Sequence, residues 1–311
     1  MTKEEMLLAL YSHFDKDIVD TVWNANRYKR IIERHIPKDG HYEDYVNVQL
    51  CAELYQQYHI PIYKLAMIYG TSDVALRERL INMGVPMRGH KCGPDTDNNY
   101  FSNIDSKNKA YFLGLMTADG CLQITSNGGY NVTIGLNQED GYILEAMRKD
   151  MNIHSQVKVY KRNVEGRIRL TSTVQIHSEQ IYNDLQRLGL TQRKSYNHDL
   201  SVPQLAQNLV SHYVRGYFDG NGIAFSNGKI GFCGARSIVQ FIHDYFTSYE
   251  EVSNVSVTYN SQNHIYYLVW YRSASVCKII EVMYNEADNL FLNRKRNKII
   301  NGLKARGIEI C

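Results

Sequence analysis

Three features that would place a protein in a broad class are missing from this sequence. No apolar run approaches the roughly 20 residues that a membrane-spanning helix needs, and the first residues do not resemble a cleavable secretory signal. The six cysteines include no CxxC pair, which argues against a zinc module and a disulfide framework. We therefore expect a protein without a membrane partner, with reduced cysteines and a cytoplasmic location.

A strong net charge is also missing, since the 311 residues carry a formal charge of +3. The charges are unevenly distributed. Residues 151–200 contain eight Lys and Arg against four Asp and Glu, and residues 288–311 contain six against two. Such basic stretches are typical of surfaces that contact nucleic acid, and equally of solvated helix faces. Charge alone leaves both interpretations open.

Turn-forming residues divide the chain, which is too long for one small core, into segments. Apolar residues at helical spacing predict a helix over 4–35, ended by Pro37, Asp39 and Gly40. We expect five segments: an N-terminal helical segment at 1–40, a second unit at 41–92, a linker at 93–100, and two repeated halves at 101–200 and 201–311.

Residues 54–84 follow the pattern of a helix-turn-helix. Gly70 would supply a turn with positive φ, and Ser72 is a suitable N-cap for a second helix with Leu76, Leu80 and Ile81 facing inward. The exposed start of that helix would meet base edges, and a basic arm would follow it into a minor groove. The candidate DNA contacts are Asp73, Val74, Arg77, Arg88 and Lys91. A plain two-helix packing unit would show the same pattern.

A repeat occupies the rest of the chain, because residues 111–120 align with 213–222 at an offset of 102 residues. Each copy is followed by an Asn-Gly pair, at 127–128 and 227–228, which indicates a hairpin turn. In each half we then expect a helix, two strands and a helix: 138–151, 155–162, 167–177 and 178–188, then 236–247, 255–260, 264–272 and 273–284.

This order predicts an α+β fold. It consists of a duplicated αββαββα domain with two antiparallel sheets, preceded by an all-α helix-turn-helix region. Equal halves indicate internal pseudo-twofold symmetry, so we expect a monomer.

Strand 167–177 alternates apolar and polar residues. Ile168, Leu170, Val174 and Ile176 share a face that we expect to be buried, and the opposite face carries long donors and hydroxyls. In a major groove, Arg and Gln on such a face pair with purine edges. An ordinary solvated sheet face would have the same pattern. The candidate contacts here and in the second half are Lys158, Tyr160, Arg162, Arg167, Arg169, Thr171, Gln175 and Lys229.

Small residues recur at i, i+4 spacing in both copies, as Gly114 and Ala118 and as Gly216 and Gly220. A glycine inside a helix costs roughly 1 kcal/mol relative to alanine, so its presence in both copies indicates two helices in close contact. With these motifs and the basic stretches that close each half, residues 100–300 resemble single-chain LAGLIDADG homing endonucleases. The resemblance implies double-stranded DNA lying on a saddle of two four-stranded sheets, and Mg²⁺- or Mn²⁺-dependent hydrolysis of its phosphodiesters.

The resemblance also implies the site residues. Asp119 and Asn221 take the penultimate positions of the two motifs, which are the metal-binding and catalytic positions. Asn221 stands where an acid is expected, and it lacks the negative charge on which hard divalent cations depend. Lys194 and either Lys295 or Lys298 would lie near the scissile phosphates.

Three functions are consistent with two unequal motifs. The enzyme cuts both strands, it nicks one strand, or it has kept only DNA binding, as a transcriptional regulator or phage repressor. A pure protein-interaction role would leave the basic strand face unexplained. The resemblance implies a mobile element or phage as the setting, and association with the nucleoid of a bacterial or phage-infected cell.

Overall fold

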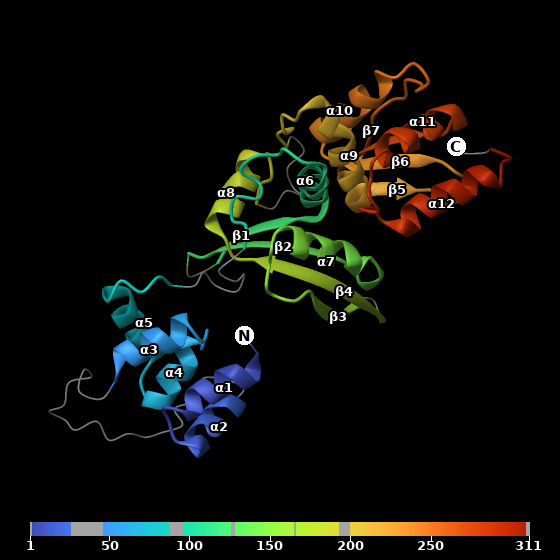
Figure 1. Ribbon diagram of the computed structural model, residues 1–311. Helices are drawn as coiled ribbons and strands as arrows, with labels where there is room; N and C mark the ends of the chain where they lie inside the picture. Colours follow the sequence, from blue (N-terminus) through green and yellow to red (C-terminus); the bar gives the residue numbers. More distant parts are fainter. Residues whose placement is uncertain are drawn as a thin grey trace. The chain divides into compact units, whose positions relative to one another are not determined.

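The computed structural model describes residues 2–25, 46–87, 96–125, 128–164, 166–192 and 200–308, without the side chains of 162, 164 and 167. The chain divides into two compact units, Met1–Arg88 and Gly89–Cys311. Among the described residues, no helix is long and apolar enough to cross a membrane. The described part of the first unit is helical (Figure 1), with α1 (Lys3–Tyr11), α2 (Lys16–Asn24), α3 (Val48–Gln56), α4 (Ile62–Tyr69) and α5 (Asp73–Asn82).

The first helix differs from the prediction, because α1 and α2 are separate helices. The Asp15 side chain accepts hydrogen bonds from the backbone N–H groups of Asp17 and Ile18, and so starts a new helix. The prediction of one continuous helix is therefore wrong between α1 and α2, and its part beyond residue 25 lies outside the described residues.

A single hydrophobic core joins α1 and α2 to the later helices, with Leu10, Val19 and Leu65 all fully buried in it. Lys64 on α4 strengthens this connection. Its ammonium donates to the carbonyls of Val22, Trp23 and Ala25 at 2.6, 3.0 and 3.3 Å. These carbonyls lie at the end of α2 and at its C-cap, where the carbonyls run out of partners along the helix, and that of Val22 also accepts from the Ala25 N–H at 3.4 Å.

Helices α4 and α5 are joined by the predicted short turn. Gly70 adopts φ 67°, and the Ser72 side chain accepts a hydrogen bond from the Ala75 N–H. Leu76 and Leu80 are buried as expected. Ile81 is 48% exposed, so its predicted inward position is wrong. One residue turns a helix by about 100°, which carries Ile81 off the face that Leu80 shares with Leu76.

The second unit has the predicted α+β order in each half. The first half is α6 (Lys107–Asp119), β1 (Cys121–Ile124), β2 (Tyr130–Asn137), α7 (Gly141–Asp150), β3 (Lys158–Val164), β4 (Arg167–Ile176) and α8 (Glu179–Arg187). The second is α9 (Gln207–Asn221), β5 (Gly222–Ala224), β6 (Ile230–Gly234), α10 (Arg236–Thr247), β7 (Thr258–Asn260), β8 (Ile265–Trp270) and α11 (Ser273–Tyr284). Helix α12 (Asn293–Lys304) follows and was not predicted.

The strands form two four-stranded antiparallel sheets, in the orders β1-β2-β4-β3 and β5-β6-β8-β7. Gly128 and Gly228 both have φ 77° in the turns that open the two sheets. Equivalent hydrogen bonds close these turns, from Thr125 N to Gly129 O and from Phe225 N to Lys229 O. The predicted hairpin turns are therefore confirmed at both glycines, whereas Asn127 lies outside the described residues.

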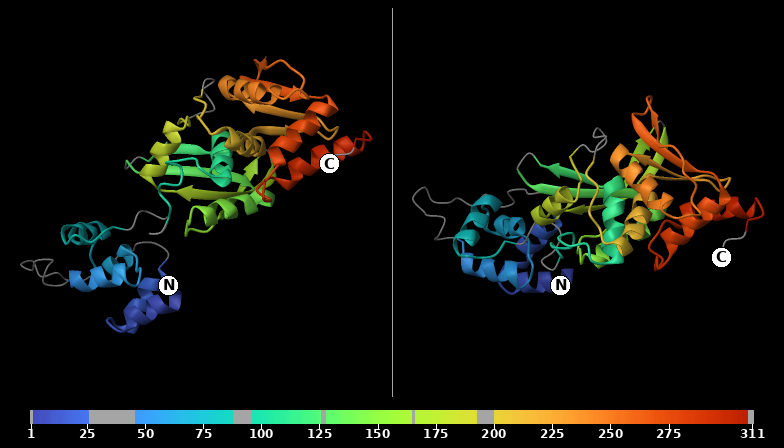
Figure 2. Two further views of the ribbon diagram at one scale, coloured as in Figure 1. Left: turned by 45° about the horizontal axis from the view of Figure 1, so that its top comes forward. Right: turned by 90° about the horizontal axis from the view of Figure 1, so that it is seen from above.

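Helices α6 and α9 pack on each other between the two sheets (Figures 1 and 2). A Cβ added to Gly114 would lie 1.9 Å from the Tyr213 carbonyl oxygen, and one added to Gly216 would lie 1.9 Å from that of Tyr111. The two contacts are equivalent at the 102-residue offset of the repeat. They confirm the predicted close contact of the two motifs.

The apolar face of strand β4 is buried only in the second part of the strand. Val174 and Ile176 are buried, but Ile168 is 60% exposed and Leu170 is 39% exposed, so the predicted apolar face is wrong at these two positions. The reason is the length of β2, whose last residue, Asn137, pairs with Thr171. Earlier residues of β4 pair with β3 alone, and the end of this hairpin extends past the core.

Candidate nucleic-acid interface

The paired helices bring both candidate metal-binding residues to one end of the pair. Asp119 and Asn221 are the last residues of α6 and α9. The Asp119 carboxylate lies against the other helix, since a Cβ added to Gly220 would be 3.0 Å from Asp119 Oδ2. Asp119 is exposed and Asn221 is half-buried. The predicted juxtaposition is thus present at the helix ends.

Hydrogen bonds orient Asn221 toward the second sheet. Its side-chain Nδ2 donates to the Tyr217 hydroxyl at 3.4 Å, and its backbone carbonyl accepts from Cys233 Sγ at 3.2 Å. Tyr217 in turn donates to the Cys233 carbonyl at 2.9 Å. The amide nitrogen is therefore held by the protein, and the amide oxygen is the side-chain atom able to bind a cation.

The donor set at the helix ends fits a divalent cation only in part. Within the described residues, no group of three or more His, Cys, Asp or Glu side chains is arranged to hold a metal ion. Asp119 offers a charged oxygen and Asn221 a neutral one. Mg²⁺ is commonly held by one or two carboxylates together with substrate phosphates and water. Such a mode fits these two residues, with most ligands supplied from outside the protein.

Lys295 lies at the same end of α9, but its ammonium is used inside the protein. It donates to the carbonyls of Phe218, Gly220 and Gly222 at 2.9, 3.0 and 2.8 Å and is 8% exposed. Burial lowers the pKa of this lysine to about 8. These bonds use all three hydrogens, so the predicted phosphate contact would require one of them to break. Lys298 is exposed on α12, and Lys194 lies outside the described residues.

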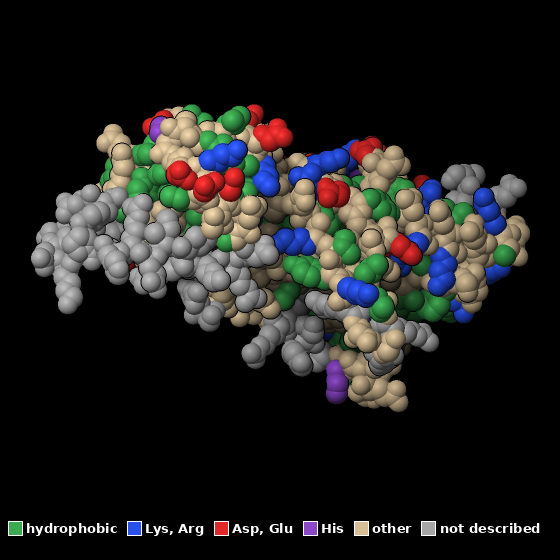
Figure 3. Space-filling model, turned by 90° about the horizontal axis from the view of Figure 1, so that it is seen from below, with side chains coloured by type: hydrophobic (Ala, Val, Ile, Leu, Met, Phe, Trp, Pro, Cys, Tyr) green, Lys and Arg blue, Asp and Glu red, His purple; other side chains and the backbone are tan. Residues whose placement is uncertain are grey.

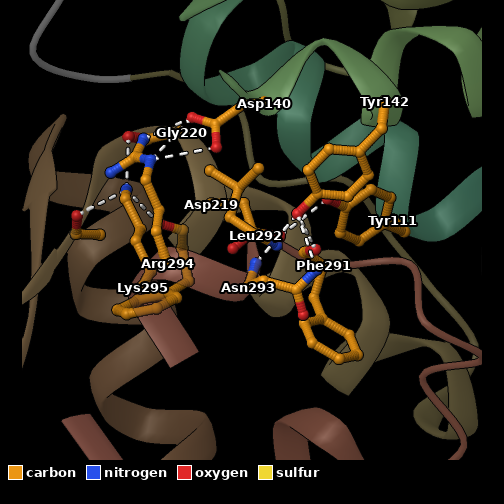
Figure 4. A network of polar contacts seen from close by, with 12 residues as sticks. Tyr111, Asp140, Tyr142, Asp219, Gly220, Phe291, Leu292, Asn293, Arg294 and Lys295 are labelled. Carbon is orange, nitrogen blue, oxygen red and sulfur yellow. Dashed lines mark hydrogen bonds and ion pairs between the residues drawn. The ribbon is translucent and has the colours of Figure 1, made fainter. Parts of the chain in front are cut away.

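Asp219, two residues before Asn221, is the centre of a buried network that the sequence did not predict (Figure 4). Its Oδ2 accepts from the Tyr111 hydroxyl at 2.7 Å and from the Leu292 N–H at 3.0 Å. No described donor satisfies Oδ1, which is also buried. Burial raises the pKa of this carboxyl to about 6, against the hydrogen bond from Tyr111. Asp219 therefore joins α9 to α6 and to the segment before α12, away from solvent.

The same segment is tied to the first half by side chains around α7 (Figure 4). The Tyr142 hydroxyl donates to the Phe291 carbonyl at 2.8 Å and accepts from the Asn293 N–H at 2.9 Å. Arg294 makes a two-pronged ion pair with the buried Asp140, at 2.7 to 3.0 Å. These partners are about 150 residues apart in the chain, and no local pattern relates them.

The first sheet gathers most of the predicted strand contacts on its open face. Cross-strand pairs place Lys158 opposite Thr173, Tyr160 opposite Thr171, and Gln175 opposite Thr133. Lys158, Tyr160 and Arg169 are exposed, and Thr171 and Gln175 are half-buried. The backbones of Arg162 and Arg167 belong to the same hairpin, but their side chains are not described. Lys229 is half-buried beside the turn between β5 and β6.

In the first unit, the start of α5 is open to solvent. Asp73 and Glu78 are exposed, Val74 is 62% exposed, and Arg77 is half-buried. The candidate arm residues Arg88 and Lys91 lie outside the described residues. Lys and Arg side chains are spread over the face in Figure 3 and do not form a single block. Specific positions, more than bulk charge, distinguish the candidate contact surfaces.

No protein-family model and no curated protein matches the chain. Several solved structures are similar to it. The homing endonuclease I-WcaI bound to its DNA recognition sequence is 15% identical with a TM-score of 0.44, over 67% of this chain and 94% of that one. I-DmoI in complex with DNA and Ca is 11% identical with a TM-score of 0.42, over 63% and 94%. The LAGLIDADG meganuclease I-CpaMI bound to uncleaved DNA is 11% identical with a TM-score of 0.42, over 66% and 93%.

Proposed function

We propose that the second unit binds a specific site in double-stranded DNA and nicks one strand of it. The observation that carries the proposal is the packing of α6 on α9. It brings Asp119 and Asn221 together between two sheets, each of which has an open face.

The open face of the first sheet supplies the means of binding. Lys158 and Arg169 are exposed cations suited to phosphates or to the acceptor edge of guanine. Tyr160, Thr171 and Gln175 add hydroxyl and amide groups on the same side of the sheet. A sheet face with this mixture can both position a duplex and read base edges.

The unequal helix ends support hydrolysis of a single strand. A Mg²⁺ or Mn²⁺ ion, when bound, would neutralise phosphate charge and lower the pKa of a bound water. Asp119 would hold such an ion with a full negative charge, whereas Asn221 offers only a neutral oxygen. The pair of helix ends therefore offers one charged and one neutral ligand, and we expect only the phosphodiester nearer the Asp119 carboxylate to be cut.

A second candidate function is DNA binding without cleavage, as in a transcriptional regulator or phage repressor. Two observations favour it: the neutral Asn221, and the use of the Lys295 hydrogens by carbonyls of the protein. The two candidates share the binding surface and differ only at the helix ends.

The test begins with the full chain and a random duplex library, from which bound sites are selected. A selected duplex is then incubated with the protein and Mg²⁺ or Mn²⁺, and each strand is followed separately on a denaturing gel. We expect a nick in one strand that Asp119→Asn abolishes while affinity is kept. Glu250→Gln, a change of an exposed acid outside the site, is the matched control. Asn221→Asp is expected to add cutting of the second strand.

The outcomes separate the candidates. Binding without a nick in either metal favours the regulator function over the nickase. Failure to select any duplex would overturn both.

A further inference from the structure

The two sheets differ sharply in charge. Strands β3 and β4 contain five cationic residues and no acidic ones, namely Lys158, Lys161, Arg162, Arg167 and Arg169. Among them, Lys161 pairs with Leu170 and lies on the face away from Tyr160 and Thr171. Strands β5 to β8, all of whose residues are described, contain no Lys, Arg, Asp or Glu. A duplex lying across both sheets would therefore meet two chemically different surfaces.

The strand register identifies the open face of the second sheet. Phe232 and Leu268 pair with each other and are fully buried, which assigns their face to the core. Side chains alternate along a strand, so the residues next to Phe232 and Leu268 in their strands face the other way. This open face includes Ile223, Gly231, Cys233, Thr258, Tyr267 and Val269. Except for Gly231, all are half-buried or exposed.

The side chains of this face suit apolar contact. Ile223 and Val269 flank Gly231 in the register, and Tyr267 pairs with Cys233. A Cβ on Gly231 would lie 3.1 Å from Val269 Cγ2. Glycine therefore leaves room for Val269 and adds no side chain to the middle of the face. In a major groove, the apolar feature that a base presents is the C5-methyl group of thymine. The strands offer no cation for phosphate.

The symmetry of the helix pair indicates what covers this face. The reciprocal contacts of Gly114 and Gly216 relate the second sheet to the first. Duplex DNA has twofold symmetry of its own in its backbone, so a duplex bound to the first open face continues over the second.

We infer that the second sheet recognises its half of the DNA site through thymine methyl groups, while the first sheet supplies most of the phosphate contacts. This inference rests on the proposed DNA binding, but it does not require cleavage.

The test uses the full chain and the duplex selected above. Protection footprints of the wild type and Arg169→Ala first identify the half of the site that lies on the first sheet. Deoxyuridine, which lacks only the methyl group, then replaces thymidine in one half at a time. In the half on the second sheet we expect affinity to fall about fourfold for each contacted methyl group, which corresponds to ~0.8 kcal/mol. The half on the first sheet is expected to tolerate the replacement.

Matched variants assign the effect to the sheet face. Val269→Thr keeps the shape of the side chain and is expected to reduce the discrimination between thymine and uracil. Val159→Thr is the control, because Val159 is 50% exposed and pairs with Ser172, on the other face of the first sheet. Lys158→Ala is expected to lower the slope of log affinity against log salt by about 1, and Val269→Thr to leave it unchanged.

The results distinguish failure of this inference from failure of the proposed DNA binding on which it rests. If no duplex is bound, the proposed function fails. If a duplex is bound but both halves respond alike to uracil, or if Val269→Thr and Val159→Thr behave alike, the inference is overturned and the proposed function stands.

Discussion

At the scale of single residues, the buried carboxyl of Asp219 is expected to make the stability of the protein depend on pH. It is 1% exposed, and burial raises the pKa of its carboxyl to about 6 from an ordinary 3.8. Between these two values the folded protein binds a proton that the unfolded chain releases. The contribution of Asp219 to the free energy of unfolding is therefore greatest at low pH and falls as the pH rises through 6.

The variant Asp219→Asn tests the direction of this pH dependence. The amide oxygen can still accept from Tyr111 and from the Leu292 N–H, but it no longer titrates. We expect the free energy of unfolding of the wild type, minus that of the variant, to fall by a few kcal/mol from pH 4 to pH 7. Denaturant titrations at both pH values measure this difference, in which groups common to the two proteins cancel. A difference that is constant or rises with pH would contradict the burial of a titrating carboxyl.

At the scale of elements, local patterns predicted much of the second unit. Helices α10 and α11 begin and end at the predicted residues, because their apolar spacing and flanking turns are contained in neighbouring residues. The glycine turns at 128 and 228 have the same local origin. The candidate site was predictable as far as the ends of α6 and α9, because glycine spacing indicated close packing of the two motifs.

What the sequence did not predict depends on distant partners. The exposure of Ile168 follows from where β2 ends, and the position of Lys295 follows from the carbonyls that it meets at the end of α9. The contact of Tyr142 with Phe291 joins residues 149 positions apart. Helical periodicity carries no information about such pairs, so the network around Asp219 emerges only from the packed structure.

The hydrogen bonds from Lys295 to carbonyls near the end of α9 lead to a prediction about the stability of the protein. Lys295→Met removes three hydrogen bonds to carbonyls near the end of the helix, and we expect the free energy of unfolding to fall by about 2 kcal/mol. Lys298→Met, at an exposed position three residues later on α12, is the control and should change it little. Denaturant titration measures both variants. Unchanged stability of Lys295→Met, with weaker cleavage or binding of DNA, would instead support the phosphate contact that the sequence implied.

At the scale of the whole molecule, the chain combines two units with separate cores. The second unit contains both sheets and the helix pair, so we expect the proposed DNA binding by the sheets not to depend on the first unit. The first unit has its own candidate surface at the start of α5. Two independent surfaces on one chain raise affinity for a site that both can reach at once.

This arrangement predicts separable contributions to DNA binding. We expect residues 96–311 alone to protect the part of the selected site that contacts the sheets, and the full chain to protect additional base pairs on one flank. In the full chain, Arg77→Ala should weaken protection of that flank and leave the remainder unchanged. Lys3→Ala, at an exposed position on α1, is the control. Footprints of the four proteins measure this directly. Identical footprints for the fragment and the full chain would show that α4 and α5 are a packing unit, and would leave DNA binding to the two sheets alone.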